Sequence, residues 1–250
     1  MKPLCIDLFC GLGGWAEGFL AEDYEVVGFD IERHDYGSGG YPGRLVLRDV
    51  LTLHGSQFRD AAVIVASPPC QAYSYRAMPW RRAKTLPPPS NDLFDACFRI
   101  QKEATEAAGH YIPLVVENVR GAQKWVGRAR WHFGSFYLWG DVPALMPTAG
   151  QFKNDSAQRG GTWFGIAHGR QQMPDHPARG DGEPGIKQSG SGAIWFNVGI
   201  ALLPSSSARR KAASAQIAKI PFSLARWIAQ VYNPSPAPQL QGGAKTKQLP

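Results

Sequence analysis

The amino-acid sequence predicts an α/β fold built on a doubly wound, mostly parallel and Rossmann-like sheet. Short runs of aliphatic and β-branched residues recur along roughly the first 140 residues, and each run is followed by turn-forming or charged residues. One interval between two runs, residues 91–108, has the apolar period of an amphipathic helix. Strands that alternate with helical segments are typical of parallel sheets with helices on both faces. We therefore expect roughly five α/β repeats in one domain.

Length and composition allow one sizeable core. The chain has 250 residues, of which 44% are hydrophobic, and no apolar run is long enough to span a membrane. Its N-terminus enters a predicted strand rather than a signal peptide, so we expect a cytoplasmic protein. The formal net charge of +7 suits a polyanionic partner such as nucleic acid. The four cysteines form no CxxC pair and the histidines no cluster, so neither a disulfide framework nor a metal site is expected.

A glycine-rich turn follows the first predicted strand. Residues 4–9 form that strand, and Cys10-Gly11-Leu12-Gly13-Gly14 leads into a helix over about 15–20. Glycines allow the backbone to approach a ligand closely, and the free N–H groups of the following helix form a polar cradle. The spacing differs from the dinucleotide pattern GxGxxG, so the turn alone does not identify a ligand.

The next two predicted strands each end in a carboxylate. Residues 25–30 form the second strand, and an acidic residue at its end, Asp30, is typical of a group that binds two ribose hydroxyls. The alternative is that Asp30 only caps a helix. Residues 45–50 form the third strand, where Asp49 could accept from an adenine amino group or pair with Arg48 in solvent.

The fourth predicted strand, residues 61–66, presents a cysteine at its carboxyl end. It is followed by Ser67-Pro68-Pro69-Cys70-Gln71, and proline can neither continue the ladder nor flex freely. Ligands bind at this edge of an open α/β sheet, which makes Cys70 a candidate nucleophile. The alternative is a buried structural cysteine, because free cysteine is among the most buried residue types.

A long basic and aromatic segment, residues 73–90, comes after the cysteine. Its length and composition indicate a mobile lid that closes on a nucleic acid, and the alternative is a disordered surface loop. Asn91 is then a candidate cap of the helix over 91–108.

The fifth predicted strand, residues 112–119, carries Glu117 among valines. Partial desolvation should raise the pKa of this carboxyl toward neutrality, as a general acid requires. A structural ion pair with Arg120 is the alternative. A further strand is expected at 136–139.

The remaining chain divides by composition. We expect a catalytic and cofactor-binding domain over 1–147 and a small Gly-rich insertion over 148–204 that is too poor in aliphatic residues to form its own core. A basic segment and an amphipathic helix, which packs back on the first domain, occupy 205–232, and a flexible tail occupies 233–250.

Three blocks, in this order, resemble signatures of the DNA cytosine-5 methyltransferase family. They are Asp7-Leu8-Phe9-Cys10-Gly11-Leu12-Gly13-Gly14, Pro69-Cys70-Gln71 with Ser74, and Glu117-Asn118-Val119. The resemblance covers roughly the first 140 residues and, more loosely, the last helix. It implies the Rossmann-like fold of S-adenosylmethionine-dependent methyltransferases.

The resemblance also implies which residues surround S-adenosylmethionine. Asp30 would hold the ribose, Ile31 would pack on the adenine, and Asp49 with Val50 would read the adenine edge. Residues implied to line the rest of this site are Phe9, Gly11, Leu12, Gly13, Gly14, Pro69 and Leu93.

The implied reaction transfers a one-carbon group to C5 of a cytosine in DNA. Cys70 would add to C6 and Glu117 would contact the base, which must be flipped out of the duplex while the 73–90 lid closes over it. Family members hold the flipped base with an Arg-x-Arg element. Its nearest match here is Arg128-Ala129-Arg130, which follows Glu117 unusually soon and lacks the preceding Gln.

Two departures from the family pattern affect specificity and donor. The 148–204 region is too short for a large target-recognition domain, so sequence specificity is expected to be slight or to come from another chain. A small enzyme of this kind fits a phage, mobile-element or restriction-modification setting in a bacterial or phage-infected cell. The segment Gln216-Ile217-Ala218-Lys219-Ile220-Pro221 resembles the family's last signature block, Gln-Ile-Gly-Asn followed by small or apolar residues and Pro, and in it Lys219 replaces an asparagine that in the family lies beside the methionine end of the cofactor. Lys219 could recognise the extra carboxylate of carboxy-S-adenosylmethionine, giving carboxymethyl transfer, or could bind the ordinary cofactor carboxylate or a DNA phosphate.

Other classes of function stay open at this point. The chain could modify cytosine in RNA or in free nucleotides, or could be a non-catalytic module that binds nucleic acid. The sequence determines neither the target site nor the oligomeric state.

Overall fold

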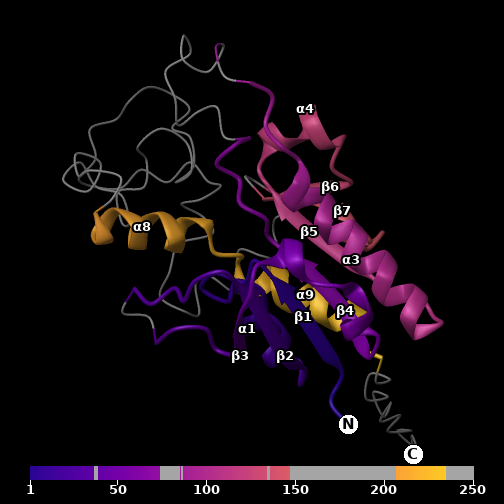
Figure 1. The fold of residues 1–250 in the computed structure, drawn as a ribbon. Helices are drawn as coiled ribbons and strands as arrows, with labels where there is room; N and C mark the ends of the chain where they lie inside the picture. The colour runs from indigo at the N-terminus through magenta and orange to yellow at the C-terminus, as the bar shows by residue number, and fades with distance from the viewer. Residues whose placement is uncertain (37–38, 74–84, 86, 134–135, 147–206, 235–250) are drawn as a thin grey trace, which may run out of the picture.

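The fold is a seven-stranded sheet with helices on both faces (Figure 1). The computed structural model describes residues 1–36, 39–73, 85, 87–133, 136–146 and 207–234. The strand order is β3-β2-β1-β4-β5-β7-β6, and every pair from β3 to β5 is parallel, whereas β7 and β6 pair antiparallel. The strands are β1 (Leu4–Leu8), β2 (Glu25–Asp30), β3 (Arg44–Leu47), β4 (Ala61–Ala66), β5 (Leu114–Asn118), β6 (Trp131–Phe133) and β7 (Phe136–Gly140).

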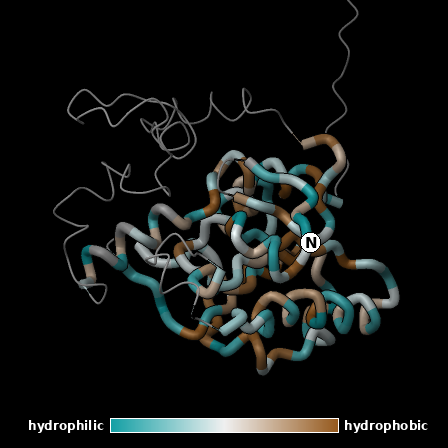
Figure 2. The backbone as a smooth tube through the Cα atoms, turned by 90° about the horizontal axis from the view of Figure 1, so that it is seen from above, coloured by the Kyte–Doolittle hydropathy of each residue, from teal (hydrophilic) through white to brown (hydrophobic). Residues whose placement is uncertain are grey.

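The helices form two layers, each over its own apolar core. On one face α1 and α9 cover a cluster that includes Trp15, Phe19 and Ile228, and on the other face α3 covers a cluster that includes Phe94 and Ile100. Many of the hydrophobic segments accordingly lie inside the body in Figure 2. The predicted doubly wound, mostly parallel fold is confirmed. The helices are α1 (Gly14–Leu20), α3 (Asp92–Ala108), α4 (Gln123–Val126), α8 (Ala208–Ala218) and α9 (Phe222–Tyr232), with 3-10 turns η1 (Val50–Thr52), η2 (Gly55–Phe58) and η4 (Arg120–Ala122).

The expectation of about five α/β repeats is wrong. Only α1 and α3 are crossover helices between parallel strands among the described residues, because β2 reaches β3 through the segment 31–43 and β3 reaches β4 through η1 and η2. Gly39 and Gly40 in that segment have positive φ angles, which a right-handed helix cannot accommodate. β3 also ends at Leu47, earlier than predicted.

The C-terminal helix α9 packs directly on α1. A Cβ atom on Gly18 would collide with the backbone of Arg226, and one on Gly14 would lie 2.5 Å from the backbone nitrogen of Ile220. The two glycines, four residues apart, therefore lie on one face of α1 and let the two segments approach closely. The Tyr24 hydroxyl adds a buried hydrogen bond to the carbonyl of Ala229 in α9.

Three other features differ from the sequence expectations or lie outside the description. The basic stretch before α9 forms a helix of its own, α8, which the sequence reading did not predict. Asn91 precedes α3, yet its side chain accepts from Tyr73 and donates to the Trp125 carbonyl instead of capping the helix. The Gly-rich insertion, the tail from 235 and most of the predicted lid lie outside the described residues.

Within the described part of the chain, none of the helices combines the length and the apolar character needed to cross a bilayer.

Candidate functional site

The candidate site lies at the carboxyl edge of the sheet, where the strand order reverses. β2 and β3 lie on one side of β1 and β4 and β5 on the other, so the chain changes direction between β1 and β4. In open α/β sheets ligands bind outside the carboxyl ends of the strands at such a point. The glycine turn leaves β1 here, and the segment that carries Cys70 leaves β4 beside it.

The glycine turn after β1 is held in an unusual backbone conformation. Phe9, Gly11 and Gly13 have positive φ angles of 57°, 50° and 75°. For a large aromatic residue such as Phe9 this is a strained conformation, which costs on the order of 1–3 kcal/mol and is concentrated at functional sites. The Gly11 amide donates to Asp30 Oδ2 at 2.9 Å, so the carboxylate at the end of β2 fixes the turn.

The glycines of this turn have different surroundings. The position of a Cβ atom on Gly11 is open, since no atom of the described residues other than Gly11 and its two neighbours lies within 4 Å of it. In contrast, a Cβ atom on Gly13 would collide with Pro42, and one on Gly14 would meet Ile220. Packing within the chain therefore explains glycine at 13 and 14, whereas Gly11 leaves room for a ligand.

The residues implied to bind a nucleoside follow β2 and β3. Asp30 Oδ1 accepts from the Ile31 amide at 2.8 Å, and the Ile31 side chain is 72% exposed. Asp49 accepts from the Leu51 amide and so caps η1, which is the local role that its residue type also predicts. Val50 is buried in the core, so only its backbone could face a ligand.

The segment that carries Cys70 is tied to both faces of the sheet. On one face the Trp15 indole of α1 donates to Ser67 Oγ at 3.0 Å. On the other, the buried Asn118 side chain at the end of β5 donates to the Pro68 carbonyl at 2.9 Å. The Tyr73 amide then donates to the Cys70 carbonyl at 3.0 Å, which closes a turn around the cysteine. These bonds hold the thiol at the edge of the sheet.

Cys70 differs from the other three cysteines in its exposure. Cys5, Cys10 and Cys97 are buried, and burial raises the pKa of each thiol, which keeps it protonated and unreactive. Cys70 is partly exposed, so the reading of a buried structural cysteine does not describe it.

Glu117 lies on β5, the strand next to β4. The register pairs Ala66 with Val116, so Glu117 lies one residue beyond the paired part of β4, at the level of Ser67. Its side chain is only 6% exposed. Carboxyl ends of adjacent parallel strands meet at one edge, and the structure thus brings Glu117 and the Cys70 segment to the same place.

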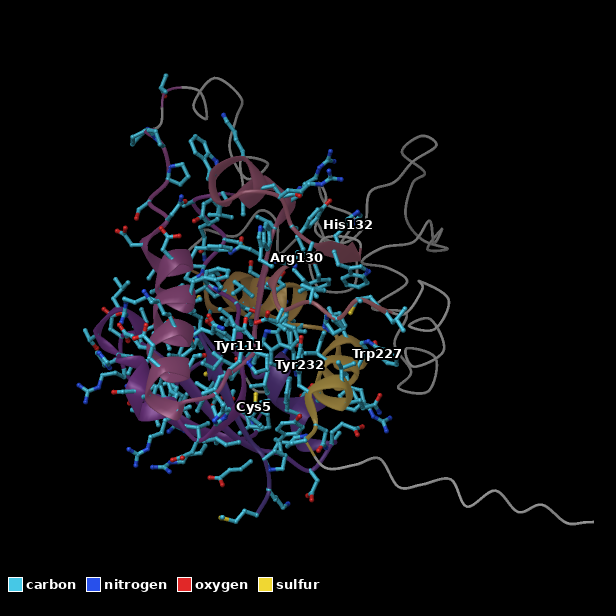
Figure 3. All side chains as sticks on the ribbon, turned by 90° about the vertical axis from the view of Figure 1, so that its right-hand side faces the viewer. Cys5, Tyr111, Arg130, His132, Trp227 and Tyr232 are labelled. Atoms are coloured by element: carbon cyan, nitrogen blue, oxygen red, sulfur yellow. The ribbon has the colours of Figure 1, made fainter. Side chains whose placement is uncertain are left out.

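The Arg-x-Arg element lies directly before β6. Glu117 pairs with Leu138, which pairs with Trp131, so these three residues share one face of the sheet. Arg130 directly precedes Trp131, and its backbone amide donates to the Leu138 carbonyl at 2.9 Å; its side chain is exposed, and the residue is labelled in Figure 3. Arg128 is exposed before β6.

Lys219 has a partner within the chain. Its ammonium group lies 2.6 Å from Glu17 Oε1 on α1, one turn after the glycine turn. The remaining two implied residues lie at the same edge, with Pro69 exposed beside Cys70 and Leu93 half-buried in the first turn of α3. Among the described residues, no three His, Cys, Asp or Glu side chains come together as metal ligands.

Sequence reasoning missed the residues that position the cysteine. Trp15, Ser67 and Asn118 were assigned no role, although Asn118 directly follows Glu117 in its block and a buried amide at a strand end signals a specific hydrogen bond.

We expect Asn118→Asp to slow turnover about 10–100-fold. An ionised carboxylate cannot donate to the Pro68 carbonyl, so the segment that carries Cys70 loses this support. A displacement of a reacting group by about 1 Å is enough for a loss of this size. Aspartate still offers an acceptor to the Val119 amide, so the fold should persist. Single-turnover kinetics would measure the loss, and an unchanged rate would show that this bond does not position the thiol.

Residues 4–126 match the model of the C-5 cytosine-specific DNA methylases. This part of the chain belongs to that family. The match includes the glycine turn, Cys70 and Glu117. None of the curated proteins is a significant match to the chain.

Solved methyltransferase structures resemble about half of this chain. A DNA modification methyltransferase encoded within an E. coli prophage is 20% identical, with a TM-score of 0.36, over 50% of this chain and 34% of the other. The S. pombe Dnmt2 methyltransferase is 16% identical, with a TM-score of 0.34, over 50% and 36%. The Entamoeba histolytica methyltransferase EhMeth is 16% identical, with a TM-score of 0.34, over 50% and 40%. The chain thus spans a little over a third of the length of these proteins.

Proposed function

We propose that the protein is a DNA cytosine-5 methyltransferase that uses S-adenosylmethionine and forms a covalent Cys70–C6 adduct. The observation that carries this proposal is the meeting of three groups at one sheet edge. A partly exposed cysteine follows β4, a buried glutamate lies one residue before the end of β5, and a strained glycine turn follows β1. The family match over residues 4–126 supports the reaction class, and in this arrangement the three groups would act as nucleophile, acid and cofactor site.

The residues around the glycine turn fit S-adenosylmethionine. Gly11 leaves open space beside the backbone, and Ile31 offers an exposed apolar surface on which an adenine could pack. A carboxylate has about four acceptor positions, so Asp30 can bind ribose hydroxyls while it holds the Gly11 and Ile31 amides. When bound, the cofactor would supply an electrophilic methyl group on its sulfonium centre.

Cys70 and Glu117 would make C5 of the cytosine reactive. The Cys70 thiolate forms a bond to C6, and Glu117 donates a proton to N3, so the electron pair of the C5–C6 bond becomes available at C5. After C5 has gained the one-carbon group, a base removes its proton, the C6–S bond breaks, and the thiolate leaves as N3 gives up its proton. Trp15 and Asn118 would hold the nucleophile in place through Ser67 and Pro68.

DNA is the proposed partner, within a bacterial or phage-infected cell. The target base must leave the stack to reach Cys70. Exposed cations at Arg128, Arg209 and Lys211 could contact phosphates. Arg128 and Arg130, directly before β6, would hold the flipped base beside Glu117.

Carboxymethyl transfer from carboxy-S-adenosylmethionine is the alternative for the same site. Lys219 would then recognise the additional carboxylate, which must compete with Glu17 for the ammonium group. The existing pair with Glu17 gives Lys219 a structural task without any such ligand.

Mass spectrometry of nucleosides would test the function. The protein is incubated with DNA, RNA or dCMP, each with S-adenosylmethionine or its carboxy analogue. We expect 5-methylcytosine in DNA, together with a covalent complex on DNA that contains 5-fluorocytosine. Modified RNA or dCMP alone would replace DNA as the substrate, carboxymethylcytosine would establish the alternative donor, and the absence of both product and adduct would refute the proposal.

A further inference from the structure

The segment that joins β2 to β3 packs against the glycine turn through Tyr41 and Pro42. A Cβ atom on Gly13 would collide with Pro42 and lie 3.0 Å from Tyr41 Cδ2. A Cβ atom on Gly28 in β2 would lie 2.6 Å from the Tyr41 hydroxyl oxygen, so the ring occupies the space that this glycine leaves. Tyr41 is therefore wedged between β2 and the turn that follows β1.

Asp7 on β1 holds the inner end of Tyr41. The sheet register pairs Asp7 with Gly28, and the missing side chain at Gly28 lets the tyrosine reach the carboxyl group. The Tyr41 hydroxyl donates to Asp7 Oδ2 at 3.0 Å. Asp7 is completely buried, and its other oxygen, Oδ1, has no hydrogen-bond partner within the described residues. The proposed reaction gives Asp7 no task.

We propose that Tyr41 is a positioning residue for the cofactor site, because it supports the glycine turn. We further propose that this support by Tyr41 depends on the protonation state of Asp7. The ring of Tyr41 and the neighbouring Pro42 keep Gly13 in its left-handed conformation, and the hydroxyl anchors the ring to β1. The same segment begins with Ile31, so its closure also places the apolar surface proposed for the adenine. The identity of the ligand as S-adenosylmethionine rests on the proposed function. The support of the glycine turn by Tyr41 does not depend on which ligand binds.

The pH dependence comes from the buried carboxyl group of Asp7. Burial raises the pKa of Asp7 to about 8; the Tyr41 hydrogen bond opposes that shift and the charge of Asp30 adds to it. The other titratable neighbours, Cys5, Cys10 and Tyr41 itself, have pKa values raised by burial and stay neutral in this range.

The sign of the pH dependence follows from the number of bound protons. In an opened segment Asp7 would regain an ordinary pKa of about 3.9. Between about pH 4 and pH 8 the closed arrangement therefore binds more protons than the open one, and it loses stability as the pH rises. Below this window the support is complete, and above it the loss is constant.

Hydrogen exchange of the ligand-free protein, together with calorimetric binding of S-adenosylmethionine, tests this proposal at pH 6 and pH 8.5. We expect wild-type exchange over residues 9–15, corrected for its intrinsic pH dependence, to increase at least fivefold at the higher pH and the cofactor affinity to fall. Asp7→Asn, which still accepts from Tyr41 but cannot ionise, should show neither change. Tyr41→Phe should exchange faster and bind the cofactor about fivefold or more weakly at both pH values. Tyr36→Phe, in the same segment, is the matched control and should resemble wild type.

The outcomes separate this proposal from the proposed function. If Tyr41→Phe resembles Tyr36→Phe in both measurements, Tyr41 does not position the turn. If the exchange pattern is as expected but wild type binds no S-adenosylmethionine, the ligand assignment fails and the support of the turn stands. If Tyr41→Phe unfolds, the comparison of Asp7→Asn with wild type decides. A rise in exchange at pH 8.5 as large in Asp7→Asn as in wild type would overturn the role of Asp7.

Discussion

Replacement of Cys70 by alanine is expected to abolish methyl transfer, with a loss on the order of 10⁴-fold or more, the scale on which removal of a covalent nucleophile acts. The reason is that C5 of cytosine becomes nucleophilic only after addition at C6. Cys70 is the partly exposed thiol at the switch point, whereas the other three cysteines are buried. Rates of methyl transfer to DNA and the yield of adduct with 5-fluorocytosine measure the loss.

The matched control is Cys97→Ser. Cys97 donates its thiol proton to the Leu93 carbonyl inside α3, and a serine hydroxyl can do the same, so activity should stay close to wild type. Cys70→Ser is a second variant of the nucleophile, and its hydroxyl is too weak a nucleophile to restore turnover. DNA binding should persist in both Cys70 variants. Turnover by Cys70→Ala at a rate near that of wild type would exclude the covalent mechanism.

The position of the site could be predicted from the sequence because it depends on local signals. A β-branched run that ends in Pro68-Pro69 places Cys70 at a strand end, and valines around Glu117 place the glutamate on the next strand. Parallel strands bring their carboxyl ends to one edge, so two local predictions give a spatial one. The sheet confirms the predicted fold class.

Features that depend on distant contacts could not be predicted. Glycine at 28 makes room for Tyr41, and the buried Asp7 is its hydrogen-bond partner, yet these three residues are far apart in the sequence. The helix α8 lacks a clear apolar stripe, so hydrophobic periodicity gave no sign of it.

Glu117→Gln is expected to reduce methyl transfer about 10²–10⁴-fold, the usual contribution of a positioned general acid. Glutamine keeps the size of the side chain and its capacity for hydrogen bonding, yet it cannot donate a proton to N3. Addition of Cys70 to C6 should slow in parallel with product formation, because both depend on the same protonated base. Rapid-quench measurement of adduct formation and of methyl transfer, each at saturating cofactor, would show this.

A matched control and two alternative outcomes test this role of Glu117. Glu106→Gln changes an exposed carboxylate on α3 that lies 3.9 Å from Lys102, and it should leave both rates unchanged. A purely structural role for the buried Glu117 would lower the thermal stability of the variant and the fraction of active protein, but the rate per active site would stay at the wild-type value. A loss confined to cofactor affinity would instead place Glu117 in the binding of S-adenosylmethionine. Only a slower adduct step in a folded protein that still binds DNA and cofactor agrees with an acid acting on the base.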